Sequence, residues 1–322
     1  MPDRPLVTVA IVSWNTRDLL RRCLGSVAPE IASGRCEVWV VDNGSSDGSP
    51  ELVRAEFPGV RLVASTDNLG FGAAVNLVAD QTDAPWLAVA NADVALRDGA
   101  LDALLEAGQA NPRAGAVAPR LVLPDGSTQH SVFGFPTVRQ ALLVSSGAAV
   151  IFPRLAERLL LLNHFDPARP RVVPWAVAAF LLVRRAAWEE VGGFDSQQWM
   201  YAEDLDLGWR LGRRGWLTVF EPAAVLEHAS AAATEQVWGE SGKVERWQHE
   251  TYAWMRRRRG RVKTVAFALV QACGQAARWV LYSIGAWRST AKYARRRAAA
   301  RWWLRLHLQG LRDALVRGSP NA

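Results

Sequence analysis

Four short runs of β-branched and other apolar residues alternate with amphipathic stretches in the first 115 residues of this 322-residue chain. The runs are too short for core helices and predict buried strands over residues 6–14, 37–41, 60–64 and 86–90. Between and after them, helices are expected to begin near Asn15 or Thr16 and at Ser49, and to cover residues 71–79 and 98–107. Strands and helices that alternate at this spacing predict a mostly parallel sheet with helices on both faces.

The pattern is less regular after residue 115. Residues 121–128 predict a hairpin with an Asp-Gly turn. The apolar run at residues 172–183 predicts one further strand. The remaining expected elements are helices over 188–192 and 205–211 and strands over 217–220 and 224–227. The predicted fold class is α/β.

The charge of the chain is divided unevenly along its length. Residues 241–322 hold 18 Lys and Arg against 3 Asp and Glu, a net charge of +15, whereas residues 1–240 hold 20 against 28, a net charge of −8. The sequence therefore predicts an acidic domain over residues 1–240 and a basic, Trp-rich helical region over residues 241–322. An acidic body argues against nucleic acid as a partner, and the basic region favours anionic partners.

Cysteine content and the amino terminus bear on the compartment. The chain has three widely spaced cysteines, Cys23, Cys36 and Cys273. This pattern is not typical of a disulfide framework or a zinc site, so we expect a reducing compartment. The first residues lead directly into an apolar strand and lack the apolar core of a signal peptide.

Two polar clusters follow the second and third predicted strands. Ligands of open α/β sheets bind at the carboxyl ends of strands, so each cluster is a candidate site. Asp42, in the sequence VVDNGSSD, can accept hydrogen bonds from a nucleobase or a ribose, although turn residues of this kind also form ordinary loops. Asn68 and Gly70, in DNLGFG, precede a helix that can hold an anion, or they can simply cap it.

Two further clusters carry carboxylates. Asn91 and Asp93 follow the fourth strand, where Asp93 can hold Mg²⁺ or Mn²⁺ against a diphosphate. Glu203 and Asp204 begin a helix among aromatic residues, where one acid can serve as a general base or both can complement the helix dipole. His228 follows a late strand, and a lone histidine there fits either a structural or a ligand role.

Taken in order, these segments resemble the inverting family 2 glycosyltransferases of GT-A fold, and within them the rhamnosyltransferase-like enzymes of bacterial envelope polysaccharide synthesis. The matching text covers roughly residues 6–230. It comprises VTVAIVSWN, VVDNGSSDGS, DNLGFGAAVN, NADV, AFLLVRRAAWEEVGGFD and MYAEDLDLGWRLGRRGW. Six motifs in the family's order are more specific than any one of them.

The resemblance implies a role for each candidate residue. Asp204 is expected to act as the general base with Glu203 beside it. Asp93 is expected to bind Mg²⁺ or Mn²⁺, with His228 as a further metal contact. The nucleotide-sugar pocket is expected to be formed by Ser13, Asn15, Asp42, Asn68, Gly70, Asn91 and Asp93.

The resemblance also implies partners and a location. The donor is expected to be a nucleoside-diphosphate sugar, with L-rhamnose as the sugar of the subgroup and UDP- and GDP-sugars left open. The acceptor is expected to be a glycan or a polyprenyl-diphosphate-linked sugar. The basic region is then expected to hold the enzyme at an anionic membrane surface, on the cytoplasmic face of the plasma membrane. Residues 264–287 are long enough to leave a single span open.

Two other functions remain compatible with the residues. A nucleotidyltransferase also uses a nucleotide-binding α/β sheet and Mg²⁺, but it usually has a basic, Gly-rich loop after the first strand, where this chain has Ser13-Trp14-Asn15. A non-catalytic sugar-nucleotide-binding module at the membrane keeps the fold without turnover. Metal-dependent hydrolysis of a sugar nucleotide without acceptor distinguishes an enzyme from such a module.

Overall fold

A computed structural model describes residues 4–154, 156, 161, 166–198, 200–229, 232–285 and 290–316. The chain divides into two compact units. The first comprises residues 1–133 and 166–239, and the second residues 134–165 and 240–322. The sequence places residues 134–165 in the first domain, whereas in the structure they group with the C-terminal helices.

The first unit is built on a nine-stranded mixed sheet. Its strand order is β3-β2-β1-β4-β10-β6-β11-β5, with β8 paired to β11. Strands β3, β2, β1 and β4 run parallel to one another, and β6 is parallel to β11. Strand β10 is antiparallel to both β4 and β6, and β5 and β8 are antiparallel to β11. The α/β fold class predicted from the sequence is confirmed. The strands of this unit, including a separate pair formed by β7 and β9, are β1 (Val7–Ser13), β2 (Cys36–Asn43), β3 (Arg61–Ser65), β4 (Trp86–Asn91), β5 (Val94–Leu96), β6 (Ala114–Val122), β7 (Val132–Phe133), β8 (Arg171–Val173), β9 (Trp175–Ala176), β10 (Phe180–Arg184) and β11 (Leu217–His228).

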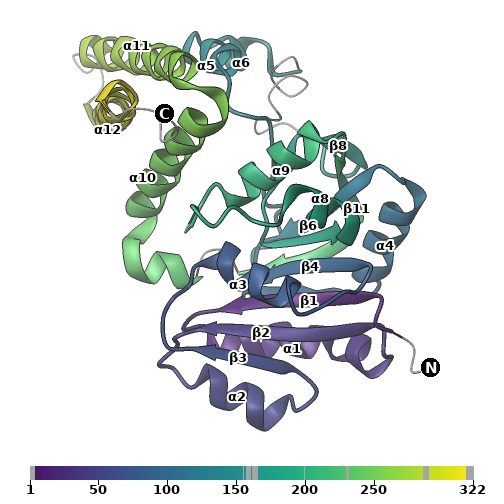
Figure 1. Cartoon of the computed structure of the whole chain (residues 1–322). Helices are drawn as coiled ribbons and strands as arrows, with labels where there is room; N and C mark the ends of the chain where they lie inside the picture. The colour runs from purple at the N-terminus through teal and green to yellow at the C-terminus, as the bar shows by residue number, and fades with distance from the viewer. Residues whose placement is uncertain are drawn as a thin grey trace. The chain divides into compact units, whose positions relative to one another are not determined.

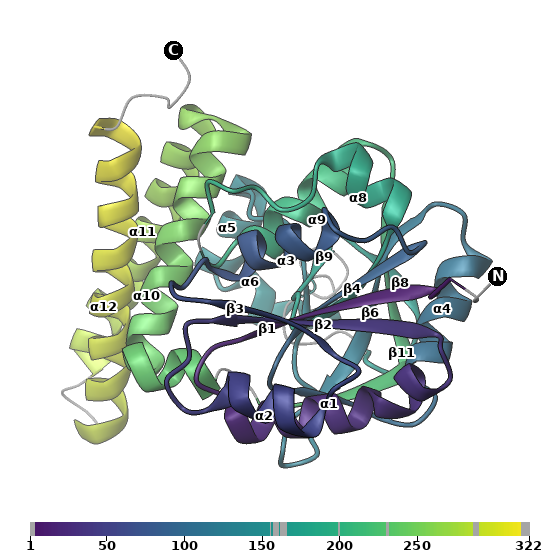
Figure 2. The ribbon, with the colours of Figure 1, turned by 60° about the horizontal axis from the view of Figure 1, so that its bottom comes forward.

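Helices cover both faces of this sheet. Figure 2 shows α1 and α2 on one face and α3, α8 and α9 on the other. The helices are α1 (Arg17–Ala32), α2 (Ser49–Glu56), α3 (Phe71–Ala79), α4 (Ala100–Ala110), α8 (Arg185–Val191) and α9 (Glu203–Arg213).

The main core lies under α1, α2 and α4. Alternate residues of β1, Val7, Val9 and Ile11, point into it and meet Leu20 of α1 and Leu104 of α4, all fully or almost fully buried. Burying one such side chain contributes about 1.5–3 kcal/mol. The parallel pairing of β3, β2, β1 and β4 places the carboxyl ends of these strands along one edge of the sheet.

Three predicted elements differ from the structure. The run at residues 172–183 is divided into β8, β9 and β10, and Pro174, which cannot donate a ladder hydrogen bond, separates β8 from β9. The two late strands are one strand, β11, with an irregularity between Glu221 and Val225. The hairpin at residues 121–128 is present but short: Val122 and Thr128 form a bridge at the end of β6, and backbone hydrogen bonds join Leu123 to Ser127 around the Asp-Gly turn.

The second unit is helical. Its elements are α5 (Val138–Ser145), α6 (Ala148–Ile151), α10 (Ala232–Arg259, of which residues 240 onward belong to this unit), α11 (Arg261–Gly285) and α12 (Thr290–Val316) (Figure 1). Helices α11 and α12 pack along one another, and α5 packs on α11. In the interior of the unit, the Tyr252 hydroxyl and His307 Nδ1 are 2.8 Å apart.

The apolar stretch considered for a membrane span falls on α11. Within the described residues no helix has the length and apolar content needed to cross a bilayer. Residues 286 and 287, the end of that stretch, lie outside the described residues.

Candidate active site

The ends of β1 and β2 form the first part of the site. Ser13 and Asp42 are partners in the parallel register, and both are buried. Asp42 Oδ2 accepts a hydrogen bond of 2.8 Å from the Ser45 N–H. Asp42 Oδ1 is buried and has no hydrogen-bond partner among the described residues. A buried carboxylate oxygen without a donor costs free energy, so this atom can accept from a ligand N–H or O–H.

Asn15 joins the two loops that follow these strands. Its backbone N–H donates to Ser45 Oγ at 2.8 Å, and its Oδ1 accepts from the Ser46 N–H at 2.9 Å. Asn15 has a φ of 50°, in the left-handed region that asparagine tolerates better than most residues. Asn15 therefore holds the loop after β2 against the loop after β1.

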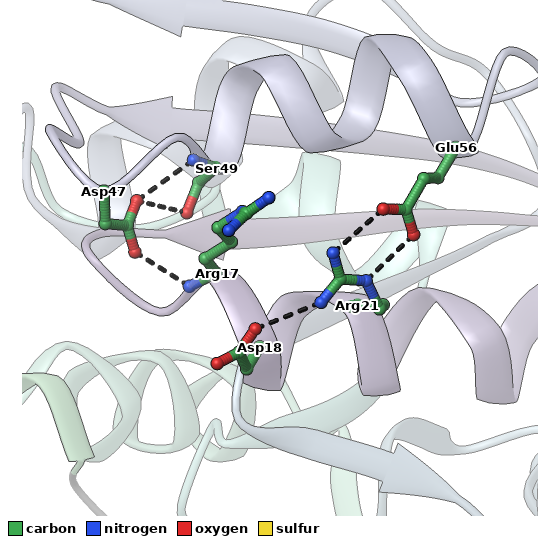
Figure 3. A network of polar contacts seen from close by, with 6 residues as sticks. All are labelled: Arg17, Asp18, Arg21, Asp47, Ser49 and Glu56. Carbon is green, nitrogen blue, oxygen red and sulfur yellow. Dashed lines mark hydrogen bonds and ion pairs between the residues drawn. The ribbon is translucent and has the colours of Figure 1, made fainter.

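Asp47 holds the same loop from its other end (Figure 3). One carboxylate oxygen accepts from the Arg17 N–H at 2.8 Å, and the other accepts from the N–H and hydroxyl of Ser49 at 3.0 and 2.6 Å. Asp47 thus caps the first turns of both α1 and α2. The sequence pattern predicted that these helices begin near Asn15 or Thr16 and at Ser49. Arg21 and Glu56 link the same two helices with hydrogen bonds of 2.8 and 2.9 Å.

Asn68 and Gly70 lie in the loop between β3 and α3. Asn68 Oδ1 accepts from the Gly70 N–H at 2.9 Å, and the Gly70 carbonyl accepts from Asn43 Nδ2 at 3.4 Å. Gly70 has a φ of 83°, which favours glycine. The loop is therefore anchored to the end of β2, one residue after Asp42.

Asn91 ends β4, and Asp93 follows it at the same edge. The Asn91 N–H donates to the Ala179 carbonyl at 2.9 Å, and the Asp93 carbonyl accepts from the Ala229 N–H at 2.9 Å. These bonds join β4 to the residues before β10 and after β11. The sheet thereby brings residues 91–93 and His228 together.

Asp93 and His228 form a close pair. Asp93 Oδ1 and His228 Nε2 are 3.2 Å apart, and both side chains are more than nine-tenths buried. The two atoms nevertheless lack hydrogen-bond geometry to each other or to another described residue. On the far side of the ring, His228 Nδ1 lies 2.6 Å from Gln129 Oε1. An Nδ1–H that donates to Gln129 leaves the Nε2 lone pair directed toward Asp93.

This pair fits a divalent cation. A carboxylate oxygen and an imidazole lone pair repel each other at this distance unless a proton or a cation lies between or beside them. Carboxylate oxygen and imidazole nitrogen are both ligands that Mn²⁺ binds. They line a cavity of about 30 Å³, enough for an ion with a water molecule. Among the described residues no three His, Cys, Asp or Glu side chains cluster as ligands, so the remaining ligands of a cation would come from substrate or water.

Two arginines that sequence reasoning did not single out lie beside this cavity. Arg22 lines it, and Arg22 and Arg97 both pair with Glu227, the residue before His228. Cys23 is near as well, and burial followed by the charge of Asp93 raises the pKa of its thiol to about 12. Cys23 is therefore a protonated packing residue and not a nucleophile.

Asp204 lies in the first turn of α9, and its position is set by the backbone. Its Oδ1 accepts from the Leu205 N–H at 2.7 Å and its Oδ2 from the Ala178 N–H at 3.3 Å. Loss of water around the carboxylate raises its pKa to about 6, although these hydrogen bonds favour the charged form. The carboxylate therefore exchanges a proton near neutral pH, which suits a general base.

The turn that leads into α9 is strained. Tyr201 and Ala202 both have a φ of 65°, which side chains with a Cβ rarely adopt. Strain of this kind occurs at sites where the surrounding structure fixes a side chain. Glu203 follows this turn and lies beside Asp204 at the helix start.

A two-residue segment links the carboxylates at positions 93 and 204. Ala178 donates its N–H to Asp204, and the carbonyl of the next residue, Ala179, accepts from Asn91. Asp204, on α9, and Asp93, just after β4, are thus connected through the segment that precedes β10. The structure brings together Ser13, Asn15 and Asp42 in one group, and Asn91, Asp93, Asp204 and His228 around the end of β4.

Comparisons with known proteins agree with this architecture. The profile of glycosyl transferase family 2 matches residues 8–135, and that of glycosyl transferase family group 2 matches residues 144–317. A mannosyltransferase, PcManGT from Pyrobaculum calidifontis, solved in complex with GDP-Man and Mn²⁺, has a similar structure. Its TM-score is 0.62 at 18% identity, over 97% of this chain and 90% of the other. The fold is that of a GT-A glycosyltransferase.

Relatives in sequence show which glycosyltransferase family the chain belongs to. An N-acetylglucosaminyl-diphospho-decaprenol L-rhamnosyltransferase of Mycobacterium tuberculosis is 38% identical over 250 residues, which cover 71% of this chain and 78% of the relative. The O-antigen biosynthesis protein RfbC of Myxococcus xanthus is 27% identical over 234 residues, 71% of this chain and 18% of that protein. The chain belongs to glycosyltransferase family 2, as its motifs predict.

Proposed function

We propose that this enzyme transfers a sugar, L-rhamnose, from a nucleoside diphosphate to a hydroxyl of a polyprenyl-diphosphate-linked acceptor, with inversion at the anomeric carbon. The choice of sugar and acceptor rests on the 38% identity to the mycobacterial rhamnosyltransferase. The chemistry rests on one observation above all. A carboxylate whose pKa is raised toward neutrality, Asp204, is joined through Ala178 and Ala179 to the strand end that carries Asp93.

The donor's base and diphosphate are assigned to different strand ends. Asp42 Oδ1, buried and without a donor among the described residues, suits the imide N–H of a thymine or uracil base. The loops of residues 42–47 and 68–70 form the wall around it. The diphosphate then extends toward Asp93, Arg22 and His228, where the positive charge of Arg22 favours it.

Asp93 and His228 would hold Mg²⁺ or Mn²⁺ at the diphosphate. Such a cation supplies charge neutralisation for the leaving nucleoside diphosphate. Gln129 orients the imidazole through Nδ1, and the buried surroundings of Asp93 keep competing water away.

Asp204 acts on the acceptor. In its charged form it takes the proton of the acceptor hydroxyl, and the oxygen attacks the anomeric carbon from the face opposite the diphosphate. One displacement inverts the configuration, and no covalent sugar–enzyme bond forms. The Leu205 and Ala178 N–H groups keep the carboxylate aimed during this step.

A transfer assay tests the proposal. The wild type is incubated with dTDP-rhamnose, UDP-sugars or GDP-sugars and a polyprenyl-diphosphate N-acetylglucosamine acceptor, and the product is identified by mass spectrometry and its anomeric configuration by NMR. Asp204→Asn is expected to lower kcat by roughly 10²–10⁴-fold with donor affinity unchanged, because the amide cannot take the proton of the acceptor and keeps only one of the two backbone hydrogen bonds.

Asp125→Asn, in an exposed turn, serves as the matched control and should leave kcat unchanged. Retention of configuration, or an Asp204→Asn enzyme that turns over at the wild-type rate, would overturn the mechanism. Binding of the sugar nucleotide without any transfer would instead identify a binding module.

A further inference from the structure

A basic groove lies between α11 and α12 of the helical unit. It has a volume of about 520 Å³ and is lined by Trp279 and Ser283 of α11 and by Ala294, Arg297, Ala298, Arg301, Trp302 and Arg305 of α12. Both helices belong to one compact unit. The groove is therefore a feature of this unit alone.

The arginines of the groove share one side of α12. Arg297, Arg301 and Arg305 are spaced four residues apart, so with about 3.6 residues per turn they project from one stripe of the helix. All three are exposed, and none forms an ion pair or hydrogen bond within the part of the chain that the structure describes. The carboxylate of Glu245 contacts a different groove residue: its Oε1 accepts a hydrogen bond from Trp302 Nε1 at 2.8 Å.

Apolar side chains are exposed at the C-terminal end of α11, the end that contributes to the groove. Trp279 is 39% exposed, and Leu281 and Ile284 are 64% and 67% exposed, which is unusual for residues of this type. Tyr282 lies beside Arg296 and Tyr293 of α12, so this end of α11 is adjacent to the basic start of α12. Exposed apolar and aromatic side chains next to unpaired arginines are typical of a surface that enters the headgroup region of a membrane.

We propose that this groove binds the phosphates of anionic phospholipids, with Trp279 inserted at the level of the headgroups. Arginine forms paired hydrogen bonds to phosphate oxygens, and the three guanidinium groups that line the groove have no carboxylate partner among the described residues. A bilayer surface is the occupant because the groove combines three arginines with Trp279, which is 39% exposed and suits the level of the headgroups, whereas a soluble phosphate would use the charges alone. The inference extends the proposed function, since a lipid-linked acceptor is met at such a surface.

The test measures binding of the full chain to vesicles by co-sedimentation. Vesicles of phosphatidylcholine alone are compared with vesicles that also contain phosphatidylglycerol. The wild type should bind the anionic vesicles at least about tenfold more strongly, and the triple variant Arg297→Gln, Arg301→Gln and Arg305→Gln should lose this preference.

A matched variant separates the groove from overall charge. Lys292→Gln, Arg295→Gln and Arg296→Gln remove the same charge from residues of α12 that do not line the groove and should reduce the partition coefficient by less than about threefold. Equal losses in the two triple variants would overturn the groove as a site and leave only diffuse attraction. Circular dichroism and thermal unfolding of each variant show whether it is folded.

Further measurements test which ligand occupies the groove and whether the groove is needed for transfer. Trp279→Ser should weaken binding to anionic vesicles without altering the response to salt, because it removes insertion and not charge. Binding of RNA or of inorganic phosphate, without any binding to vesicles, would overturn the proposal. Transfer to a short, water-soluble acceptor should be unchanged in the groove variant. If no transfer occurs in any protein while the vesicle results hold, the proposed reaction fails and the groove stands.

Discussion

Two carboxylates of the first unit, Asp204 and Asp47, have pKa values shifted in opposite directions because their surroundings differ. Asp204 loses water around its side chain, which raises its pKa to about 6. For Asp47, burial acts to raise the pKa, but hydrogen bonds from Ser49 and Arg17 outweigh it and lower the pKa. The first residue is therefore suited to exchange a proton, and the second to remain charged at a helix start.

The pKa of Asp204 predicts the acid limb of the pH–rate profile. A general base works only in its charged form, so activity should fall as the pH decreases through about 6, with a slope of one. The measurement is kcat/KM for transfer between about pH 5 and 8 on a fixed donor, with the residual rate of Asp204→Asn as reference. An Asp204→Asn enzyme that keeps the same inflection would contradict the assignment.

Gln129 is predicted to support cation binding without contacting the cation. Replacement by leucine removes the acceptor for His228 Nδ1–H and should weaken Mn²⁺ binding by about 10–100-fold. Calorimetric titration of Mn²⁺ in the presence of a nucleoside diphosphate measures this. Gln197→Leu, at an exposed residue, is the control. Equal Mn²⁺ affinity in the Gln129 and Gln197 variants would count against the role of His228 as a ligand.

The sequence was informative for residues that follow strands. Asp42 and Asp93 stand out because polar residues at the end of an apolar run lie at a sheet edge, and Asp204 stands out as a carboxylate at a helix start among aromatic residues. Gln129 and the Ala178 N–H were missed, since one belongs to an irregular segment and the other is a backbone group with no sequence signal. Their roles depend on contacts across 99 and 26 residues, which only the folded chain defines.

At the level of elements, α1 and α2 depend on one shared cap. Asp47→Ala removes hydrogen bonds to the first turns of both helices and should lower the free energy of unfolding by about 1–3 kcal/mol. Asp18→Ala, which removes only an exposed contact to Arg21, should change it by less than about 0.5 kcal/mol. Urea denaturation followed by circular dichroism measures both.

The same cap gives a pH dependence to stability. The pKa of Asp47 is lowered in the folded protein, so its stabilisation is present above the unfolded pKa and is lost as the pH falls through the folded pKa. The difference between wild type and Asp47→Ala should therefore shrink on acidification. A difference that grows at low pH would show that the carboxylate is not the cap.

Gly274 of α11 permits close packing of α5. A Cβ added there would lie 2.5 Å from the Cβ of Ser145, whose hydroxyl donates to Gln271 Oε1 at 2.8 Å. Gly274→Val should therefore lower the thermal unfolding temperature by several degrees, as overpacking costs about 1–3 kcal/mol. Ala277→Val, on the exposed side of α11, should leave it nearly unchanged.

Element prediction succeeded where the pattern is local. The helix at residues 71–79 has the expected bounds, and the four first strands differ by one or two residues at their ends. The direction of β10 and the union of the late strands into β11 were not predictable, because a buried apolar run carries no sign of which neighbour it pairs with. Pairing is decided by the sheet as a whole.

At the scale of the whole molecule, charge is separated between the units. The acidic residues are concentrated before position 240 and the basic residues after it. Because of this separation, the anion binding proposed for the helical unit depends on positive charges that the chemistry of the sheet unit does not use. High salt should therefore release the protein from anionic vesicles while transfer to a soluble acceptor continues, as ultracentrifugation and a parallel activity assay would show.

The chain enters the helical unit twice, at residues 134–165 and again from residue 240. A truncated protein that ends at residue 240 would keep α5 but lose α11, the helix on which it packs. Such a fragment should self-associate during gel filtration, and a monomeric product with native ellipticity would contradict this expectation. The two halves are thus not modules that recombination can exchange at a single junction: a lineage that replaced the tail would have to replace the insertion with it.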